Sequence, residues 1–158
     1  MNTDVTWQTG SSSSEATLKI AGQLGLNCRG GEVFLLKSDL GGGKTTFVKG
    51  LAKGLGSSDQ VGSPTYTINR VYACAQGREL QHFDFYRLNE AGIVENELAE
   101  VINEPKTITA IEWGDIVEDG LPPKRVTITL ERQASGEEAR LVTFSYPEEL
   151  EYIFKGIR

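Results

Sequence analysis

Apolar residues recur along this chain in two patterns, one typical of helices and one of buried strands. From Glu15 to Leu26, and again from Lys44 to Leu55, apolar residues return every three or four positions, which predicts two amphipathic helices. Between these segments, Val33 to Leu36 is an unbroken run of four apolar residues and predicts a buried strand. Residues 1–13 are polar, so we expect a weakly ordered segment whose last serines cap the first helix.

The second half of the chain alternates β-branched runs with helical patterns. A β-branched and aromatic run through Ala75, and a second run from Glu79 to Phe85, flank a turn at Ala75–Arg78 and predict a hairpin. The other expected elements are a helix over Asn89–Asn103, a buried strand over Thr107–Ile111, a second hairpin of Arg125–Glu131 with Arg140–Ser145, and a closing helix over Pro147–Lys155. Strands that alternate with helices indicate an α/β fold.

Length and composition limit the classes of function. A chain of 158 residues fits one domain, which we expect to cover residues 1–158. Residues 1–14 lack the basic region and apolar run of a signal peptide, and no run approaches the roughly 20 apolar residues of a membrane span, so we expect neither export nor a membrane anchor. The two cysteines, Cys28 and Cys74, form no paired motif, so we expect free thiols in a cytoplasmic protein. The net charge of −6 argues against direct binding along a nucleic-acid backbone.

The loop from Ser38 to Thr46 joins the first apolar strand to the second helix, which is the setting of a phosphate-binding P-loop. Three consecutive glycines have no Cβ, so backbone N–H groups can turn inward around phosphate oxygens at the helix N-terminus. Lys44 would then reach the β- and γ-phosphates, and Thr45 would offer a hydroxyl to Mg²⁺. The motif usually opens with glycine where this chain has Ser38. The alternative is a glycine-rich turn that precedes Lys-Thr by chance.

Hydrolysis of a nucleotide also needs an acid near Mg²⁺ and a group that orients water. Glu112 directly follows an apolar run and is the better candidate for the metal, and Asp84 lies among aromatic residues in His82-Phe83-Asp84-Phe85-Tyr86-Arg87. Asp84 could instead be a buried, hydrogen-bonded acid, and His82 more often packs than acts as a base. Trp113 is either core or a wall of the nucleotide pocket.

A Ser-Pro-Thr segment follows the second expected helix. Ser63 and Thr65 lie where a P-loop protein places a switch-like loop, in which a hydroxyl senses the γ-phosphate through Mg²⁺. The equally good alternative is that both residues only shape the turn before a strand.

Five blocks of sequence together resemble the bacterial TsaE (YjeE) family. They are Ser38 to Thr46, Val61 with Ser63-Pro64-Thr65-Tyr66-Thr67, His82 to Leu88, Ile111-Glu112-Trp113, and Leu121-Pro122. The blocks occur in the family's order and span nearly the whole chain. The resemblance implies a P-loop NTPase-like three-layer fold, with a central, mainly parallel sheet, antiparallel hairpin strands and flanking helices.

The resemblance also implies an activity. The protein would be a Mg²⁺-dependent ATPase, weak alone and stimulated by partners, that acts with TsaB and TsaD. It would be required for N6-threonylcarbamoyladenosine at adenosine 37 of tRNAs that read ANN codons, meeting tRNA only through that complex. The resemblance implies that Lys44, Asp84 and Glu112 are catalytic and that Thr45 and Glu112 bind Mg²⁺. The residues that it implies for nucleotide binding are Asp39, Leu40, Gly41, Gly42, Gly43, Lys44, Thr45, Thr46, Trp113 and Arg140. Ser63 and Thr65 belong to the switch-like loop.

Two other classes of function remain open from the residues. A small-molecule kinase would need an acceptor pocket and an arginine-rich lid, of which the sequence gives little sign. A nucleotide-binding scaffold with little turnover is suggested by Ser38 in place of the first glycine. A GTPase is disfavoured, because the chain has no Asn-Lys-x-Asp motif.

Overall fold

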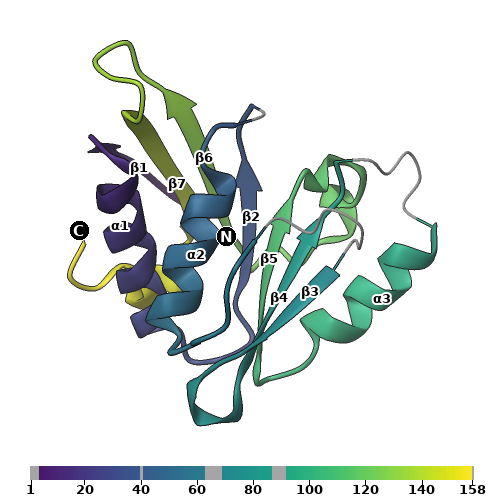
Figure 1. The fold of residues 1–158 in the computed structure, drawn as a ribbon. Helices are drawn as coiled ribbons and strands as arrows, with labels where there is room; N and C mark the ends of the chain where they lie inside the picture. Colours follow the sequence, from purple (N-terminus) through teal and green to yellow (C-terminus); the bar gives the residue numbers. More distant parts are fainter. Residues whose placement is uncertain (1–3, 40, 63–68, 87–91, 158) are drawn as a thin grey trace.

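A seven-stranded mixed sheet forms the centre of the computed structural model, which describes residues 4–39, 41–62, 69–86 and 92–157 (Figure 1). The strands lie in the order β1-β7-β6-β2-β5-β4-β3. Their bounds are β1 Asp4–Ser11, β2 Val33–Lys37, β3 Asn69–Ala73, β4 Glu79–Asp84, β5 Thr107–Glu112, β6 Val126–Arg132 and β7 Arg140–Pro147. The α-helices are α1 Ser14–Asn27, α2 Lys44–Gly54 and α3 Gly92–Ile102, and the 3-10 turns are η1 Ala75–Gly77, η2 Gly114–Ile116, η3 Glu118–Gly120 and η4 Glu148–Phe154.

The four central strands, β6, β2, β5 and β4, run parallel to one another, whereas β7 pairs antiparallel with β6 and β1, and β3 pairs antiparallel with β4. All six residues of β5 are buried, as are the first four of β2, because helices cover both faces of the sheet there. The predicted parallel centre and both predicted hairpins are therefore confirmed. The carboxyl ends of the parallel strands β2, β4 and β5 lie at the same end of the sheet.

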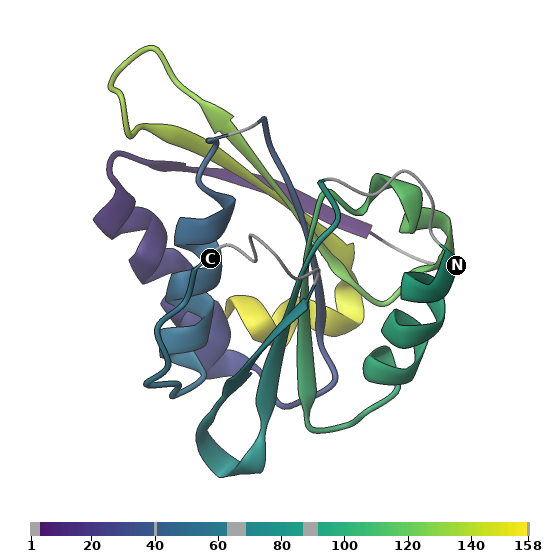
Figure 2. The same cartoon turned by 45° about the vertical axis from the view of Figure 1, so that its right-hand side comes forward.

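Helices α1 and α2 cover one face of the sheet and α3 covers part of the other, so the architecture has three layers (Figures 1 and 2). The larger core lies under α1 and α2, and the smaller core lies between α3 and the opposite face. The two helices of the first layer approach closely through glycines: a Cβ on Gly54 would lie 2.0 Å from the carbonyl oxygen of Gly22. This packing fixes where α2 begins relative to the sheet.

The largest correction to the predicted fold concerns the N-terminal segment. Residues 4–11, expected to be weakly ordered, form strand β1 and pair along their full length with β7. The ring of Trp7 packs on Phe144 with centroids 4.9 Å apart and on Phe154 at 5.7 Å. The segment alternates half-buried and exposed residues, which is the period of two that an edge strand shows. The prediction was wrong because it relied on the polar composition of the segment and not on this alternation.

Other boundaries follow the sequence closely. Ser13 caps α1 by accepting a hydrogen bond from the N–H of Ala16, as predicted for the serine run. The predicted closing helix is confirmed as a 3-10 helix over Glu148–Phe154, which buries Leu150, Ile153 and Phe154. Cys28 and Cys74 are free thiols, and burial raises the pKa of each. Within the described residues, no helix is both long and apolar enough to cross a membrane.

Candidate nucleotide site

The glycine loop between β2 and α2 adopts backbone angles that other residues rarely take. Gly41 has φ 75° and Gly43, the N-cap of α2, has φ 105°, both in the left-handed region. Gly42 is constrained by space instead, since a Cβ there would lie 2.4 Å from Oγ of Ser38. Of these three positions the motif specifies glycine only at 43, whereas the geometry of the loop favours glycine at positions 41, 42 and 43. Leu40, one of the predicted nucleotide contacts, lies outside the described residues.

Two arginines from the β6–β7 hairpin hold the glycine loop from outside. Arg132 Nη2 donates to the carbonyl of Gly41 at 3.0 Å, and Arg140 Nε donates to the carbonyl of Gly42 at 2.9 Å. Figure 2 shows this hairpin projecting beyond the sheet beside the start of α2. Carbonyl and N–H point in opposite directions in a trans peptide, so the bond from Arg140 turns the N–H of Gly43 away from the hairpin. That orientation suits an N–H that meets an anion at the helix N-terminus.

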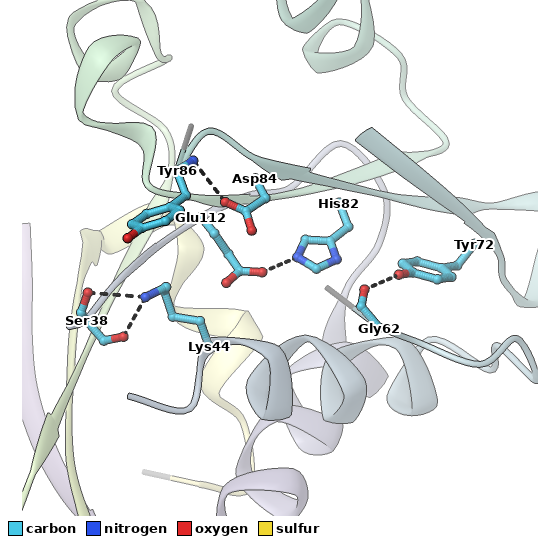
Figure 3. A network of polar contacts seen from close by, with 8 residues as sticks. All are labelled: Ser38, Lys44, Gly62, Tyr72, His82, Asp84, Tyr86 and Glu112. Carbon is cyan, nitrogen blue, oxygen red and sulfur yellow. Dashed lines mark hydrogen bonds and ion pairs between the residues drawn. The ribbon is translucent and has the colours of Figure 1, made fainter. Parts of the chain in front are cut away.

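Lys44, the first residue of α2, is buried with its ammonium among oxygen atoms. Its Nζ donates to Oγ of Ser38 at 2.8 Å, to the carbonyl of Ser38 at 3.2 Å and to the carbonyl of Asp39 at 3.4 Å (Figure 3). It also lies 4.1 Å from the ring centroid of Trp113. Burial lowers the pKa of Lys44, and the charges of Glu112 and the other nearby carboxylates oppose that shift. A cation held in this way is preorganised for phosphate.

Two acids end neighbouring strands opposite this lysine. Asp84 and Glu112 are register partners at the carboxyl ends of β4 and β5. Asp84 Oδ1 accepts from the N–H of Tyr86 at 3.0 Å, and Glu112 is buried against Nε2 of His82 (Figure 3). In open α/β sheets ligands bind at this end of the strands. Both predicted acids therefore lie at the carboxyl end of the sheet, where the glycine loop also begins after β2.

Trp113 follows Glu112 in a left-handed conformation, with φ 56° and ψ 44°. A bulky residue there is strained, and such strain persists only where the surroundings enforce it. Its ring packs on Tyr86 with centroids 4.9 Å apart and lies beside the ammonium of Lys44. Trp113 thus forms a half-buried wall at the site rather than part of the core interior.

Most of the predicted site residues gather around the N-terminus of α2. The members in the described part of the chain are Asp39, Gly41, Gly42, Gly43, Lys44, Thr45, Thr46, Asp84, Glu112, Trp113 and Arg140. Thr45 and Thr46 lie in the first turn of α2 and are half-buried. Ser63 and Thr65 lie outside the described residues, so their switch-like role stays a prediction. Arg140 holds a loop carbonyl, and its contact with nucleotide also stays a prediction.

Sequence reasoning missed Arg132 and did not connect His82 with Glu112. Arg132 and Arg140 are register partners across the β6–β7 hairpin, so aligning the two predicted strands about their turn would have put both at its base. The bond between the hydroxyl of Ser38 and Lys44 was also unforeseen. Each of these contacts joins segments distant in sequence or depends on a loop conformation.

The donor set suits Mg²⁺ bound together with a nucleotide. Among the described residues, no three His, Cys, Asp or Glu side chains cluster as a metal cage. Mg²⁺ does not need one, because it usually keeps several waters and binds one or two carboxylates together with substrate phosphates. Glu112 and the hydroxyl of Thr45 are the candidate ligands.

Comparisons with known proteins agree on one family. The model of the family described as "Threonylcarbamoyl adenosine biosynthesis protein TsaE" matches residues 11–142. The tRNA threonylcarbamoyladenosine biosynthesis protein TsaE of Bacillus subtilis is 35% identical over 131 residues, which cover 83% of this chain and 80% of that protein. The protein of the same name from Treponema pallidum is 41% identical over 107 residues, covering 67% and 77% of the two chains.

A solved structure is similar over almost the full length. The crystal structure of YdiB from Bacillus subtilis superposes with a TM-score of 0.72 at 32% sequence identity, and the match covers 97% of this chain and 93% of that one. The similarity therefore extends into β1 and the C-terminal segment, most of which lie outside the residues matched by the family model.

Proposed function

Because this chain belongs to the TsaE family of threonylcarbamoyladenosine biosynthesis proteins, we propose that it is a Mg²⁺-dependent ATPase that serves this tRNA modification. One observation carries the ATPase part: Lys44 is buried at the start of α2, between a glycine loop and two acids at strand ends. A loop, lysine and acids in this order make up the P-loop type of nucleotide site.

The proposed roles follow from positions around α2. The phosphates lie at the N-terminus of the helix, where the N–H of Gly43 and the helix dipole favour negative charge. Lys44 exchanges its bonds to Ser38 and Asp39 for phosphate oxygens. Bound Mg²⁺ would neutralise charge on those oxygens, with Thr45 and Glu112 as its protein ligands.

The remaining site residues take supporting roles in the proposal. Asp84 orients the attacking water from the end of β4, and Trp113 bounds the nucleotide pocket. Asp39, Leu40, Gly41, Gly42 and Thr46 complete the phosphate cradle, with Ser63 and Thr65 as the switch-like loop. Phosphoryl transfer needs mainly positioning and charge stabilisation, which these groups supply.

The biological setting is proposed from the family. The protein acts with TsaB and TsaD in the cytoplasm, and its ATP turnover supports repeated rounds of modification at adenosine 37. A net charge of −6 favours tRNA held by the partners rather than by this chain.

A reconstituted assay tests the proposal. The purified protein is mixed with TsaB, TsaD, tRNA, the threonylcarbamoyl adenylate and ATP, and modified tRNA per enzyme and phosphate release are both counted. We expect slow phosphate release by the protein alone, faster release with TsaB and TsaD, and several modified tRNAs per enzyme. Unchanged release and no dependence of modification on this protein would refute the proposal.

A nucleotide-binding scaffold with little turnover is the second candidate. It is favoured by the bond between the Ser38 hydroxyl and Lys44, which gives the lysine a partner that a glycine at this position lacks. Tight ATP binding without phosphate release under any partner condition would support it over the ATPase.

A further inference from the structure

A buried histidine lies directly behind the acid that we assign to Mg²⁺. His82 has no exposed surface, and its Nε2 contacts Oε2 of Glu112, itself only 3% exposed (Figure 3). The two residues come from neighbouring parallel strands, with Glu112 two residues beyond Ala110, the register partner of His82. Both side chains lie on the face of the sheet that packs against α2, the helix that begins with Lys44.

The direction of the bond follows from the chemistry of the two groups. A ring nitrogen that faces a carboxylate carries the proton, because its lone pair would otherwise face the lone pairs of the oxygen. Nδ1 of His82 has no hydrogen-bond partner among the described residues. In the part of the chain that the structure describes, the polar contact of His82 is therefore the one with Glu112.

The contact uses only one of the two carboxylate oxygens. Figure 3 shows the second oxygen of Glu112 turned to the side on which Lys44 lies. A glutamate side chain has three rotatable bonds, and fixing one oxygen restricts where the other can point. Hydrogen-bonded partners of a metal-binding group typically change metal affinity on the order of 10–100-fold when they are removed.

The ring of His82 is itself held in place. The ring of Tyr72 packs beside it with centroids 6.3 Å apart, and the Tyr72 hydroxyl donates to the carbonyl of Gly62 at 3.1 Å. Tyr72, anchored to Gly62, thus restricts the imidazole from the side of β3.

We infer that His82 is a positioning residue that orients the Glu112 carboxylate and so determines how strongly Mg²⁺ tightens nucleotide binding. The inference rests on the proposed function, because it takes Glu112 as the Mg²⁺ ligand. It assigns His82 no contact with nucleotide or metal.

The test compares two amides that differ in reach. His82→Gln places its amide nitrogen where Nε2 lies and keeps a donor for Glu112. His82→Asn is one methylene shorter, so its nitrogen falls near Nδ1 and Glu112 loses its donor. The dissociation constant of a non-hydrolysable ATP analogue is measured by calorimetry, once with EDTA and once with Mg²⁺. The readout is the ratio of the constant with EDTA to the constant with Mg²⁺, which states how strongly Mg²⁺ tightens binding.

We expect His82→Gln to keep a ratio close to that of the wild type, and His82→Asn to reduce it on the order of 10–100-fold. Equal ratios in the two variants would overturn the inference. Thr109→Val is the matched control: it removes a buried hydroxyl on β5 that has no partner in the described residues, and its ratio should be unchanged. If His82→Asn does not fold, His82→Leu fills the space without a donor and carries the same expectation.

A Glu112→Ala arm separates this inference from the proposed function. A wild-type ratio in Glu112→Ala would refute the Mg²⁺ role of Glu112 and with it the metal part of the proposed function. A reduced ratio in Glu112→Ala together with a wild-type ratio in His82→Asn would refute only the positioning role of His82.

Discussion

The glycine loop and the acid pair face each other across the candidate site, yet they are built in opposite ways. The loop presents backbone groups, and it is held by long side chains, Arg132 and Arg140, that reach in from another hairpin. The acid pair presents side chains, and it is held by backbone, because Asp84 and Glu112 end two paired strands. Lys44 lies between the two regions and is influenced by both.

Because of this difference, we expect the loop and the acid pair to be sensitive to different substitutions. The loop depends on the absence of side chains and on hydrogen bonds near the surface, so added atoms or lost arginines should deform it. The acid pair depends on a buried sheet, so only removal of a carboxylate or of its immediate partner should affect it.

The largest effect is expected at Lys44, where the two regions meet. Lys44→Ala removes a preorganised positive charge that in the proposal stabilises the transition state, a loss on the order of 10²–10³ in turnover. Phosphate release from ATP, measured with saturating Mg²⁺, checks this expectation. Turnover within a few-fold of the wild type would mean that the lysine is not the charge that links loop and acids.

A smaller loss is expected when a side chain is added to the loop. A Cβ on Gly42 would lie 2.4 Å from Oγ and 2.6 Å from Cβ of Ser38, and 2.9 Å from the carbonyl oxygen of Asp39. Overpacking of this kind typically costs about 1–3 kcal/mol, or roughly 5- to 150-fold in nucleotide affinity. We expect Gly42→Ala to weaken ATP binding by that amount in a calorimetric titration.

The double variant Ser38→Gly/Gly42→Ala sharpens this test. It removes two of the three close contacts, so ATP affinity should recover in part. Gly10→Ala is the control, because a Cβ there meets nothing within 4 Å. If the double variant binds no better than Gly42→Ala, the loop is not limited by the Ser38 side chain.

The sequence predicts where the glycine loop and the acids lie, but not the contacts that hold them. The strand, glycine loop and helix follow one another in the chain, so local pattern located the loop and Lys44 correctly. The positions of Asp84 and Glu112 could be predicted because each ends a recognisable strand. The contacts that hold these groups could not be predicted, since His82 to Glu112 and Arg132 to Gly41 depend on which strands and hairpins become neighbours in space. Strand β1 was missed because its pairing with β7 outweighs its polar composition.

The arginines test whether the loop is held from outside. Arg140 is half-buried and donates to the carbonyl of Gly42, so Arg140→Ala should reduce ATP affinity by about 1 kcal/mol, or roughly fivefold. Arg132 makes a similar bond at a more exposed position, and its loss should matter less.

A neutral donor at position 140 decides how this arginine acts. Arg140→Gln can keep a hydrogen bond to the loop carbonyl without a charge. Affinity between the wild type and Arg140→Ala, with little dependence on salt, would support the holding role. If Arg140→Gln behaves as Arg140→Ala and the loss shrinks at high salt, Arg140 acts through its charge on the phosphates.

The smallest effect concerns the stability of the protein without nucleotide. Burial lowers the pKa of Lys44 below its ordinary value of 10.5, so the unfolded chain binds the proton more tightly than the folded one. Stability then rises with pH between the folded and the unfolded pKa, because the folded state no longer holds an unfavourable buried charge. In Lys44→Met this gain is absent, so the free energy of unfolding of the variant minus that of the wild type should fall as pH increases toward 10.5.

Urea unfolding at neutral and alkaline pH measures this difference, with Lys49→Met on the exposed side of α2 as the control for one lost charge. A difference that stays constant with pH, or that rises, would show that the carboxylates near Lys44 offset the burial of its charge in full.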